Sequence, residues 1–379
     1  MSSDSSAGRA TSPGRVHPFG RLAAAALTIG AVVLSSGIGR AHEEYVTDER
    51  EDVELAAFYR EALSDPAVVG PLLVAGVALA LAIGAYLYGR PVRRDLLAFR
   101  VAMSEYREYV PWLLRISFGI PLIGAGFSGY FVSPAVAADV RLLQVLLGFL
   151  LLFGLTTRLA AIAALVVYVV GLAFAPALLL QFEVVGGALA IAILGGGTPS
   201  ADHVLLRLAE TEGTITGRFD TVARFGHAIQ ARVAPLRRYV PTVCRIGLGL
   251  TFVYLGASQK LLDPGLALAV VSRYDLSGVL PVPPELWVLG AGLTEILLGL
   301  GLLVGAFTRA VSVTALVVFT ATLFALPDDP VLAHVGLFGL ASVLLITGAG
   351  PWSVDARLSR HDPTVHVPSP GDPVPTTDD

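Results

Sequence analysis

The chain has 379 residues, of which 54% are hydrophobic and 15% are charged, and its formal net charge is −4. Soluble domains average about 25% charged residues, so this composition excludes an ordinary soluble protein and predicts extensive contact with lipid. Cys244 is the single cysteine, which excludes an intramolecular disulfide, a Cys-rich zinc site and a cysteine-bound iron–sulfur cluster within the chain. The sequence has no block of lysine and arginine of the kind that would indicate a nucleic-acid partner.

The first apolar run covers residues 22–38 and ends before the small residues Gly39 and Ala41. This pattern fits a cleavable signal peptide and an uncleaved membrane anchor equally, so residues 1–41 are expected to be one or the other. Residues 42–67 are rich in aspartate and glutamate and are expected to form an acidic extracytoplasmic segment.

Apolar runs of nearly 20 residues then recur along the chain, and about 20 residues of helix cross the hydrocarbon core of a bilayer. The sequence therefore predicts an all-α, polytopic transmembrane protein of the cell membrane, with the lipid bilayer as its main partner. The predicted spans are 68–88, 111–131, 139–155, 159–176, 181–196, 241–262, 285–305, 309–326 and 331–348.

Arginine is concentrated in the segments 89–110 and 197–240, which the positive-inside rule assigns to the cytoplasm. Alternating spans then place the tight turns at Arg158 and Arg309 inside and residues 327–330 outside. Both termini are expected to be cytoplasmic if the first span is uncleaved.

Amphipathic stretches near 93–108 and 218–238 are expected to be interfacial helices, and residues 206–240 a cytoplasmic linker. The polar tail, residues 359–379, is expected to be disordered.

An internal repeat relates the two halves of the chain. "YVPWLLRISFG" at Tyr109–Gly119 matches "YVPTVCRIGLG" at Tyr239–Gly249, at an offset of 130 residues. The offset later becomes 151, because the second copy has 21 extra residues around 265–283. We expect two four-helix repeats, at 89–205 (with its interfacial helix) and 241–358. An even number of spans per copy makes the repeats parallel.

The second repeat resembles the DoxX family through short motifs. They are the Arg-Ile-x-x-Gly start, a Gly followed by Gln-Lys-Leu, a buried glutamate, a Gly-x-x-Thr-Arg turn and a closing Gly-x-x-Ser-x-Asp. The residues are Arg245, Ile246, Gly249, Gly256, Gln259, Lys260, Leu261, Glu295, Gly305, Thr308, Arg309, Gly350, Ser353 and Asp355. The first repeat departs from the pattern, with Gly129-Tyr130 in place of Gln-Lys and Gln144 in place of the glutamate.

Members of the DoxX family are small four-helix membrane proteins, and the resemblance implies the same bundle here. Their relatives include subunits of a terminal quinol oxidase and of a thiosulfate:quinone oxidoreductase. Other relatives are tied to oxidative-stress complexes, cofactor maturation or cargo handling. A quinone ligand and a redox partner protein are therefore expectations from the resemblance. Haem, flavin, iron–sulfur and metal sites are not expected, and the oligomeric state stays open.

Polar side chains inside apolar spans are costly, at about 2.5–3.5 kcal/mol for a charge on insertion scales, so they usually face a bundle interior. Gln259, Lys260, Glu295 and His334 are predicted to line a ligand pocket that opens outward, with the extra residues 265–283 as a lid. Lys260 is also the chain's single lysine. The alternative is a paired or protonated Glu295 that only locks the bundle.

The counterparts of Glu295 and His334 in the first repeat are Gln144 and Glu183, with Glu183 expected near the outer membrane surface. Either pair could instead form only interhelical hydrogen bonds. Structural roles are expected for Arg115, Arg158, Arg245, Arg309, Gly256 and Gly299. Arg245 is expected to extend its side chain to the cytoplasmic headgroups.

Three functions fit these observations. The first is a subunit of, or an accessory to, a quinone-linked or redox-protective membrane system. The second is a transporter or carrier, although the spans show no paired helix breaks at matching depths. The third is a non-catalytic assembly or cargo-binding protein that uses residues 42–66 for docking. Whether the protein is an enzyme, and which residues would be catalytic, stays open.

Overall fold

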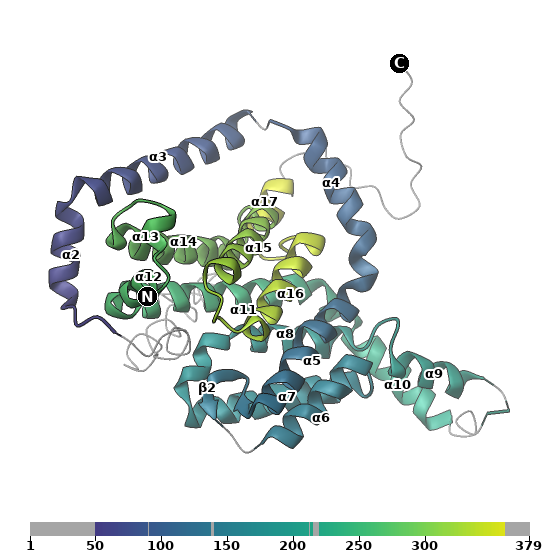
Figure 1. Ribbon diagram of the computed structural model, residues 1–379. Coiled ribbons are helices and arrows are strands. Elements are labelled where there is room, and N and C mark those ends of the chain that lie inside the picture. Colours follow the sequence, from purple (N-terminus) through teal and green to yellow (C-terminus); the bar gives the residue numbers. More distant parts are fainter. Residues whose placement is uncertain (1–49, 90, 138–139, 212, 215–219, 361–379) are drawn as a thin grey trace, which may run out of the picture. The chain divides into compact units, whose positions relative to one another are not determined.

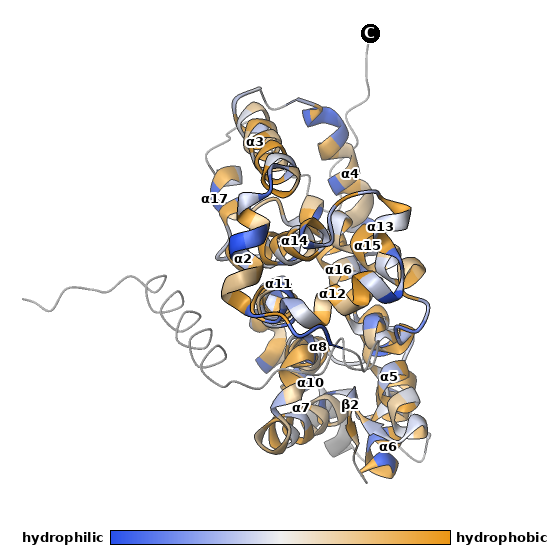
Figure 2. Cartoon of the chain, turned by 60° about the vertical axis from the view of Figure 1, so that its left-hand side comes forward, coloured by the Kyte–Doolittle hydropathy of each residue, from blue (hydrophilic) through white to orange (hydrophobic). Residues whose placement is uncertain are grey.

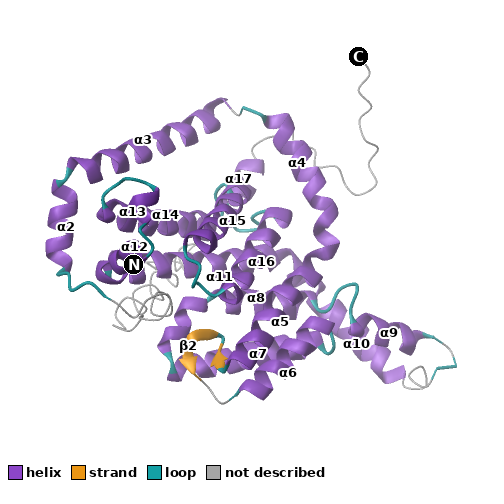
Figure 3. Cartoon of the chain, viewed as in Figure 1, coloured by secondary structure: helices purple, strands orange, loops and turns teal. Residues whose placement is uncertain are grey.

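The structure is a computed structural model that describes residues 50–360 except residues 90, 138–139, 212 and 215–219 (Figure 1). The expected signal peptide or anchor, the start of the acidic segment and the expected disordered tail beyond residue 360 lie outside the described residues. The described chain is helical apart from one short hairpin, β1 (Tyr130–Phe131) and β2 (Ser133–Ala137) (Figure 3). The prediction of an all-α polytopic membrane protein is confirmed.

Before the two halves lies an N-terminal set of helices. It comprises α2 (Leu55–Ser64), α3 (Pro66–Gly89), α4 (Arg93–Glu105) and the 3₁₀ turn η1 (Tyr106–Tyr109). Hydrophobic residues surround α3, whereas polar residues gather on α2 and α4 (Figure 2). Because nearly every side chain of α3 is exposed within the chain, its apolar surface is suited to lipid.

The first half contains α5 (Val110–Ser128), α6 (Arg141–Phe153), α7 (Thr157–Phe174), the turn η2 (Pro176–Gln181) and α8 (Glu183–Leu194). The linker contains α9 (Ala201–Glu210), α10 (Asp220–Val233) and the turn η4 (Ala234–Tyr239). The second half contains α11 (Val240–Leu255), η5 (Gly256–Leu261), α14 (Pro284–Val304), α15 (Thr308–Ala325), α16 (Val331–Thr347) and α17 (Val354–Arg360). The extra segment of the second half forms α12 (Pro264–Arg273) and α13 (Leu276–Val279).

Within the described chain, six helices are long and apolar enough to cross a membrane. The predicted spans 139–155 and 181–196 form shorter helices, of 13 and 12 residues. At 1.5 Å per residue these helices are only about 18–20 Å long. The predicted span 111–131 also stops early, at Ser128, because Gly129 adopts φ 84° and the hairpin follows. The first half is therefore less regular than its hydropathy suggests.

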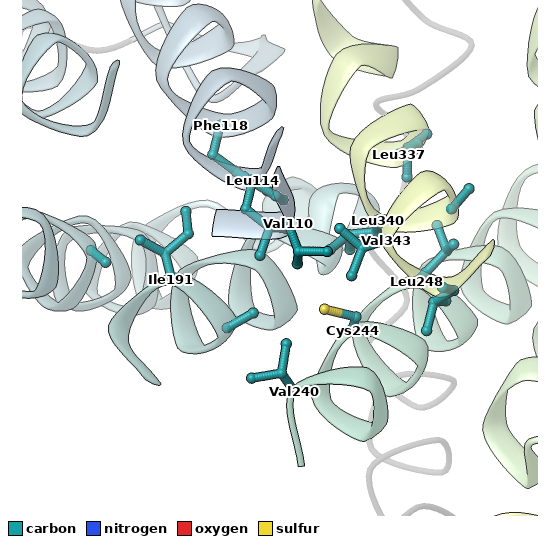
Figure 4. Packing of buried hydrophobic residues seen from close by; sticks show 14 of the residues in the cluster. Val110, Leu114, Phe118, Ile191, Val240, Cys244, Leu248, Leu337, Leu340 and Val343 are labelled. Carbon is teal, nitrogen blue, oxygen red and sulfur yellow. The ribbon is translucent and has the colours of Figure 1, made fainter. Parts of the chain in front are cut away.

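The core lies where the halves meet. Helix α5 packs against α16, and α11 packs against α8, so the first helix of each half contacts the last apolar helix of the other. Leu114, Cys244, Leu248 and Leu340 are fully buried in this core (Figure 4). Burial of such side chains stabilises the contact by about 1.5–3 kcal/mol for each large aliphatic group if water is the reference solvent.

Candidate functional site

One end of the bundle is organised by a buried arginine in each half; we call it the arginine end. In the first half, Arg115 is 3% exposed. Its Nε donates to Leu151 O at 3.0 Å, its Nη2 to Leu152 O at 2.9 Å, and its Nη1 to Pro199 O at 2.7 Å and Gly196 O at 2.5 Å. Two of these carbonyls, Leu151 O and Leu152 O, lie in the last turn of α6, where carbonyls lack partners in the following turn of helix, and Leu151 O also accepts from Gly154 N at 3.1 Å.

Arg245 does the same in the second half, where it is 2% exposed. Its Nη1 donates to Leu302 O at 2.9 Å and Leu303 O at 2.5 Å, its Nε to Ala349 O at 3.1 Å, and its Nη2 to Trp352 O at 2.6 Å. The expectation that Arg245 reaches the headgroups is therefore wrong. The carbonyls at the end of α14 and in the closing loop hold the guanidinium inside the protein, and Leu302 O also accepts from Gly305 N at 3.0 Å.

A second arginine in each half binds the C-terminal carbonyls of the last helix. Arg158 Nη2 donates to Leu194 O at 3.2 Å, and Arg309 Nε donates to Leu345 O at 2.9 Å. Aspartates complete the arrangement by accepting bonds from the first amides of α7 and α15. Asp202 accepts from Thr156 N and Thr157 N at 2.6 and 2.8 Å, and Asp355 accepts from Phe307 N and Thr308 N at 2.8 and 2.9 Å.

Glycines allow the first two membrane helices of the second half to touch. A Cβ at Gly249 would lie 2.9 Å from Gly299 O, and one at Gly299 would lie 2.7 Å from Gly249 O. A Cβ at Gly256 would lie 2.6 Å from Gly292 O and 3.0 Å from the Cβ of Glu295. This close approach brings the end of α11 and η5 against α14, and so places Lys260 beside Glu295.

At the end of the bundle opposite the arginines, Lys260 Nζ lies 3.2 Å from Glu295 Oε2, with side chains 15% and 16% exposed. Lys260 belongs to η5, a π-helical segment that continues α11, in which Leu262 N donates to Ala257 O. Such π-turns are rare and frequently occur at functional sites, because they re-aim the side chains that follow. The predicted neighbourhood of Lys260 and Glu295 is present in the structure as an ion pair.

His334 and Asp329 form a second pair beside the first. His334 Nε2 lies 3.4 Å from Asp329 Oδ2, and these side chains are 4% and 3% exposed. Lys260 is also close enough for its charge to act on Asp329. We call Lys260, Glu295, Asp329 and His334 the acid–base cluster. Gln259, the remaining residue of the predicted pocket, precedes Lys260 in the sequence, and its side chain is buried.

Asp329 is a buried carboxyl of the cluster, next to the start of α16. Its Oδ1 is buried and has no hydrogen-bond partner among the described residues. Burial raises the pKa of this carboxyl, and the nearby charges of His334 and Lys260 oppose that rise. A buried carboxyl with an unused oxygen is suited to accept a proton or to contact a ligand donor.

Sequence reasoning missed Asp329 because it placed "PDDP" in an outer loop. The available signal was its position just before the apolar helix that carries His334.

The extra segment of the second half packs next to this cluster. Helix α12 is buried almost throughout, between α2 and α14, with Phe58, Leu268 and Val288 in one apolar contact group. Arg273 and Tyr274, at its end, bind Asp328 at 3.0 and 2.9 Å. The segment thus contacts both η5 and the loop that carries Asp329, and its role as a lid stays a prediction.

The described part of the acidic segment also reaches this region. Tyr59 in α2 donates from its hydroxyl to Leu261 O at 2.7 Å, and Arg50 pairs with Asp263. Glu51 N donates to Gly265 O at 3.1 Å. The segment is therefore packed on the second half immediately after Lys260.

The first half replaces the Lys–Glu pair with a neutral contact. Gln144 is buried, and its Nε2 donates to Tyr130 O in the hairpin at 3.1 Å. These two residues occupy the sequence positions that correspond to Glu295 and Lys260. A charged, partly accessible pair thus has a buried hydrogen bond as its counterpart.

Glu183 does not lie near the outer surface, contrary to expectation. Thr251 Oγ1 donates to Glu183 Oε2 at 3.0 Å, and Thr251 is 11 residues into α11. At 1.5 Å per residue that is roughly 17 Å along the helix, close to half the bilayer core. The turn η2 carries the chain inward before α8 starts, which places Glu183 between the two halves.

Among the described residues, no group of three or more His, Cys, Asp and Glu side chains is arranged to hold a metal ion.

Comparison with known proteins agrees with the DoxX resemblance. Residues 240–328, which run from the start of α11 to the loop before α16, match the family model of DoxX. No curated protein matches the chain, and no solved structure matches it. The match contains Arg245, Lys260 and Glu295. The chain is thus a multi-pass membrane protein that carries a DoxX domain in its second half.

Proposed function

We propose that the acid–base cluster binds the head group of a membrane quinone and exchanges protons with it. The protein would then be a subunit of, or an accessory to, a quinone-linked or redox-protective membrane system. The observation that carries this proposal is the partly accessible Lys260–Glu295 pair, with the Asp329–His334 pair directly beside it. The DoxX domain supports it, because the family resemblance includes subunits of quinone-reactive complexes.

The chemistry of quinones matches the side chains present. A quinone carbonyl oxygen accepts hydrogen bonds, and Lys260 and His334 can both donate them. Reduction to a quinol consumes a pair of electrons and a pair of protons. The electrons would come from a partner redox protein, and the protons would pass from the cluster to the quinone oxygens. Lysine is suited to this role because, unlike arginine, it can lose its proton in a buried setting.

Quinone binding by the detergent-purified full chain tests the proposal. We would extract its lipids, quantify any quinone, and titrate the depleted protein with a short-chain quinone while following tryptophan fluorescence. Glu295→Gln and Lys260→Arg are expected to weaken binding by at least about tenfold, which corresponds to losing one charge-assisted hydrogen bond. The matched control is Gln144→Leu, which alters the equivalent place in the first half.

Two results would sink the proposal. One is quinone binding no stronger than to empty detergent micelles. The other is equal affinity in the wild type and in Glu295→Gln, with both proteins folded.

A proton-coupled carrier is the second candidate, and Glu183 favours it. This carboxyl is buried near mid-membrane at the contact between the halves, where Thr251 donates to it. Intramembrane acids at such contacts often mark proton or ion pathways. Uptake of a proton-linked substrate by proteoliposomes, abolished by Glu183→Gln but retained in Gln144→Leu, would favour the carrier over the quinone subunit.

A further inference from the structure

At the arginine end, further exposed arginines lie close to the arginines that bind the helix-end carbonyls. Arg309 donates to Leu345 O and Ile346 O at 2.9 and 3.2 Å, which engages its Nε and Nη2. The exposed Arg100 and Arg107 lie close enough for their charges to act on Arg309. Three guanidinium groups therefore share one region.

A similar arrangement occurs in the first half. Arg158 donates from Nη2 to Leu194 O, while its Nη1 is buried and has no hydrogen-bond partner among the described residues. The exposed Arg237 lies close enough for its charge to act on Arg158. Arg158 and Arg309 occupy corresponding positions of the two sequence copies.

Each arginine group combines a lead-in segment with the half that this segment does not precede. Helix α4 and η1 lead into the first half, yet both contact α16 of the second half. The turn η4 leads into the second half, yet it contacts α8 of the first. The lead-in segments therefore deliver Arg100, Arg107 and Arg237 to arginines of the opposite half.

Nearby acids do not balance these charges. Asp202 and Asp355 are the carboxylates whose charges act on Arg158 and Arg309. Both carboxylates already accept two backbone N–H bonds at the starts of α7 and α15. Each group thus keeps a surplus of positive charge, and like charges repel unless an anion lies between them.

Aromatic residues gather at the same end of the bundle. Tyr239 packs against Trp352 with ring centroids 4.8 Å apart and the rings tilted by 39°, and Arg238 lies 4.7 Å from the Tyr239 ring centroid. Tyr106, Tyr109 and Trp112 are exposed at the start of the first half. Tyrosine and tryptophan are enriched where the bilayer core meets the headgroups.

We propose that the arginine end carries two binding sites for the phosphate of an anionic phospholipid. One is formed by Arg100, Arg107 and Arg309, and the other by Arg158 and Arg237. Arginine is suited to phosphate because its planar donors form paired, charge-assisted hydrogen bonds with phosphate oxygens. Basic pockets between membrane helices are a known mode of phospholipid headgroup recognition. The proposal is independent of the quinone hypothesis, because it involves the opposite end of the bundle.

Native mass spectrometry of the detergent-purified full chain tests the two sites. Phosphatidylglycerol would be titrated against phosphatidylcholine, with inorganic phosphate as a separate competitor. We expect stronger binding of phosphatidylglycerol at two sites and little competition from inorganic phosphate. Arg100→Gln/Arg107→Gln should weaken one site by roughly 30-fold, and Arg237→Gln should weaken the other by about fivefold.

The matched control removes the same charge elsewhere on the lead-in segments. Arg94→Gln/Arg232→Gln alters two exposed arginines of α4 and α10 and should leave both sites unchanged. Thermal unfolding in detergent would establish that all variants are folded. Equal losses in the control and the site variants would overturn the proposal, since the binding would be nonspecific. Displacement by inorganic phosphate would also overturn it, because the ligand would then be a free anion.

Discussion

At the arginine end, the first half (residues 110–205) and the second half (residues 240–358) form the same bonds at matched positions. Arg115 and Arg245 each bind the last carbonyls of the second helix and two carbonyls of the closing loop. At the opposite end the halves differ. A hairpin and the Gln144–Tyr130 bond occupy the first half, whereas the second half has a π-helical segment, the Lys260–Glu295 pair and α12.

The difference separates side chains that hold the helices together from side chains that the fold does not require. Buried arginines that satisfy helix-end carbonyls are needed by any copy of this bundle, because unpaired carbonyls in lipid are costly. Charged side chains at the other end are also costly and are not needed to close the helices. Their presence in one half and replacement in the other therefore points to a specific role for the acid–base cluster.

The largest expected effect comes from the shared arginines. Arg115→Leu and Arg245→Leu should each destabilise the protein by more than about 4 kcal/mol, because each removes four charge-assisted hydrogen bonds to backbone carbonyls. The measurement is thermal and denaturant unfolding in detergent. Similar losses of unfolding free energy in both variants would support the structural equivalence of the halves.

Arg94→Leu is the control for these substitutions. It removes an exposed arginine and should change stability by less than about 0.5 kcal/mol. If only one of Arg115 and Arg245 proved important, the equivalence of the two halves would be broken.

The next effect concerns the pair that only the second half contains. Lys260→Met should cost about 3 kcal/mol, because Glu295 would lose its counterion in a largely buried place. Lys260→Met/Glu295→Met should recover most of that loss, as measured by a double-mutant unfolding cycle. In the first half, Gln144→Leu should cost only about 1 kcal/mol, the value of one hydrogen bond. No recovery in the double variant would contradict the ion pair.

Much of the fold could be predicted from the sequence, because apolar length and arginine placement directly reflect the bilayer. The spans 241–262, 285–305, 309–326 and 331–348 match α11 with η5, α14, α15 and α16 to within a few residues. The hairpin after Ser128 could not be predicted, since its residues are apolar and hydropathy does not distinguish them from a continuing helix.

The candidate site was predictable in part. Lys260 and Glu295 could be placed together because small residues on both helices permit close contact. Asp329 was missed because a Pro-flanked acidic pair resembles an exposed turn, and only tertiary packing buries one member of it. Arg245 was misplaced because spacing along a helix gives depth and does not reveal which carbonyls need donors.

A smaller effect is expected where the halves meet. Thr251→Val should cost about 1 kcal/mol, because it removes the hydroxyl that donates to Glu183. Thr251→Ser keeps the hydroxyl and should stay close to wild type in the same unfolding assay. Glu183→Gln should also be mild, since an amide oxygen can accept the same bond. A large loss in Glu183→Gln with an unaffected Thr251→Val would show that Glu183 acts through its charge.

The smallest effect concerns the contact between the extra segment and the loop before α16, which has no counterpart in the first half. Hydrogen bonds from Tyr274 and Arg273 hold the pKa of Asp328 below its ordinary value of about 4. The depressed pKa means that the contact contributes stability above about pH 4 and loses it as the pH falls through the lower, folded-state value. Hydrogen exchange of residues 264–283, corrected for intrinsic rates, should therefore increase below about pH 4 relative to residues 110–205. Asp328→Asn should show this faster exchange already at neutral pH with little further change on acidification. If the variant instead keeps the wild-type pH dependence, Asp328 does not hold the extra segment against the loop.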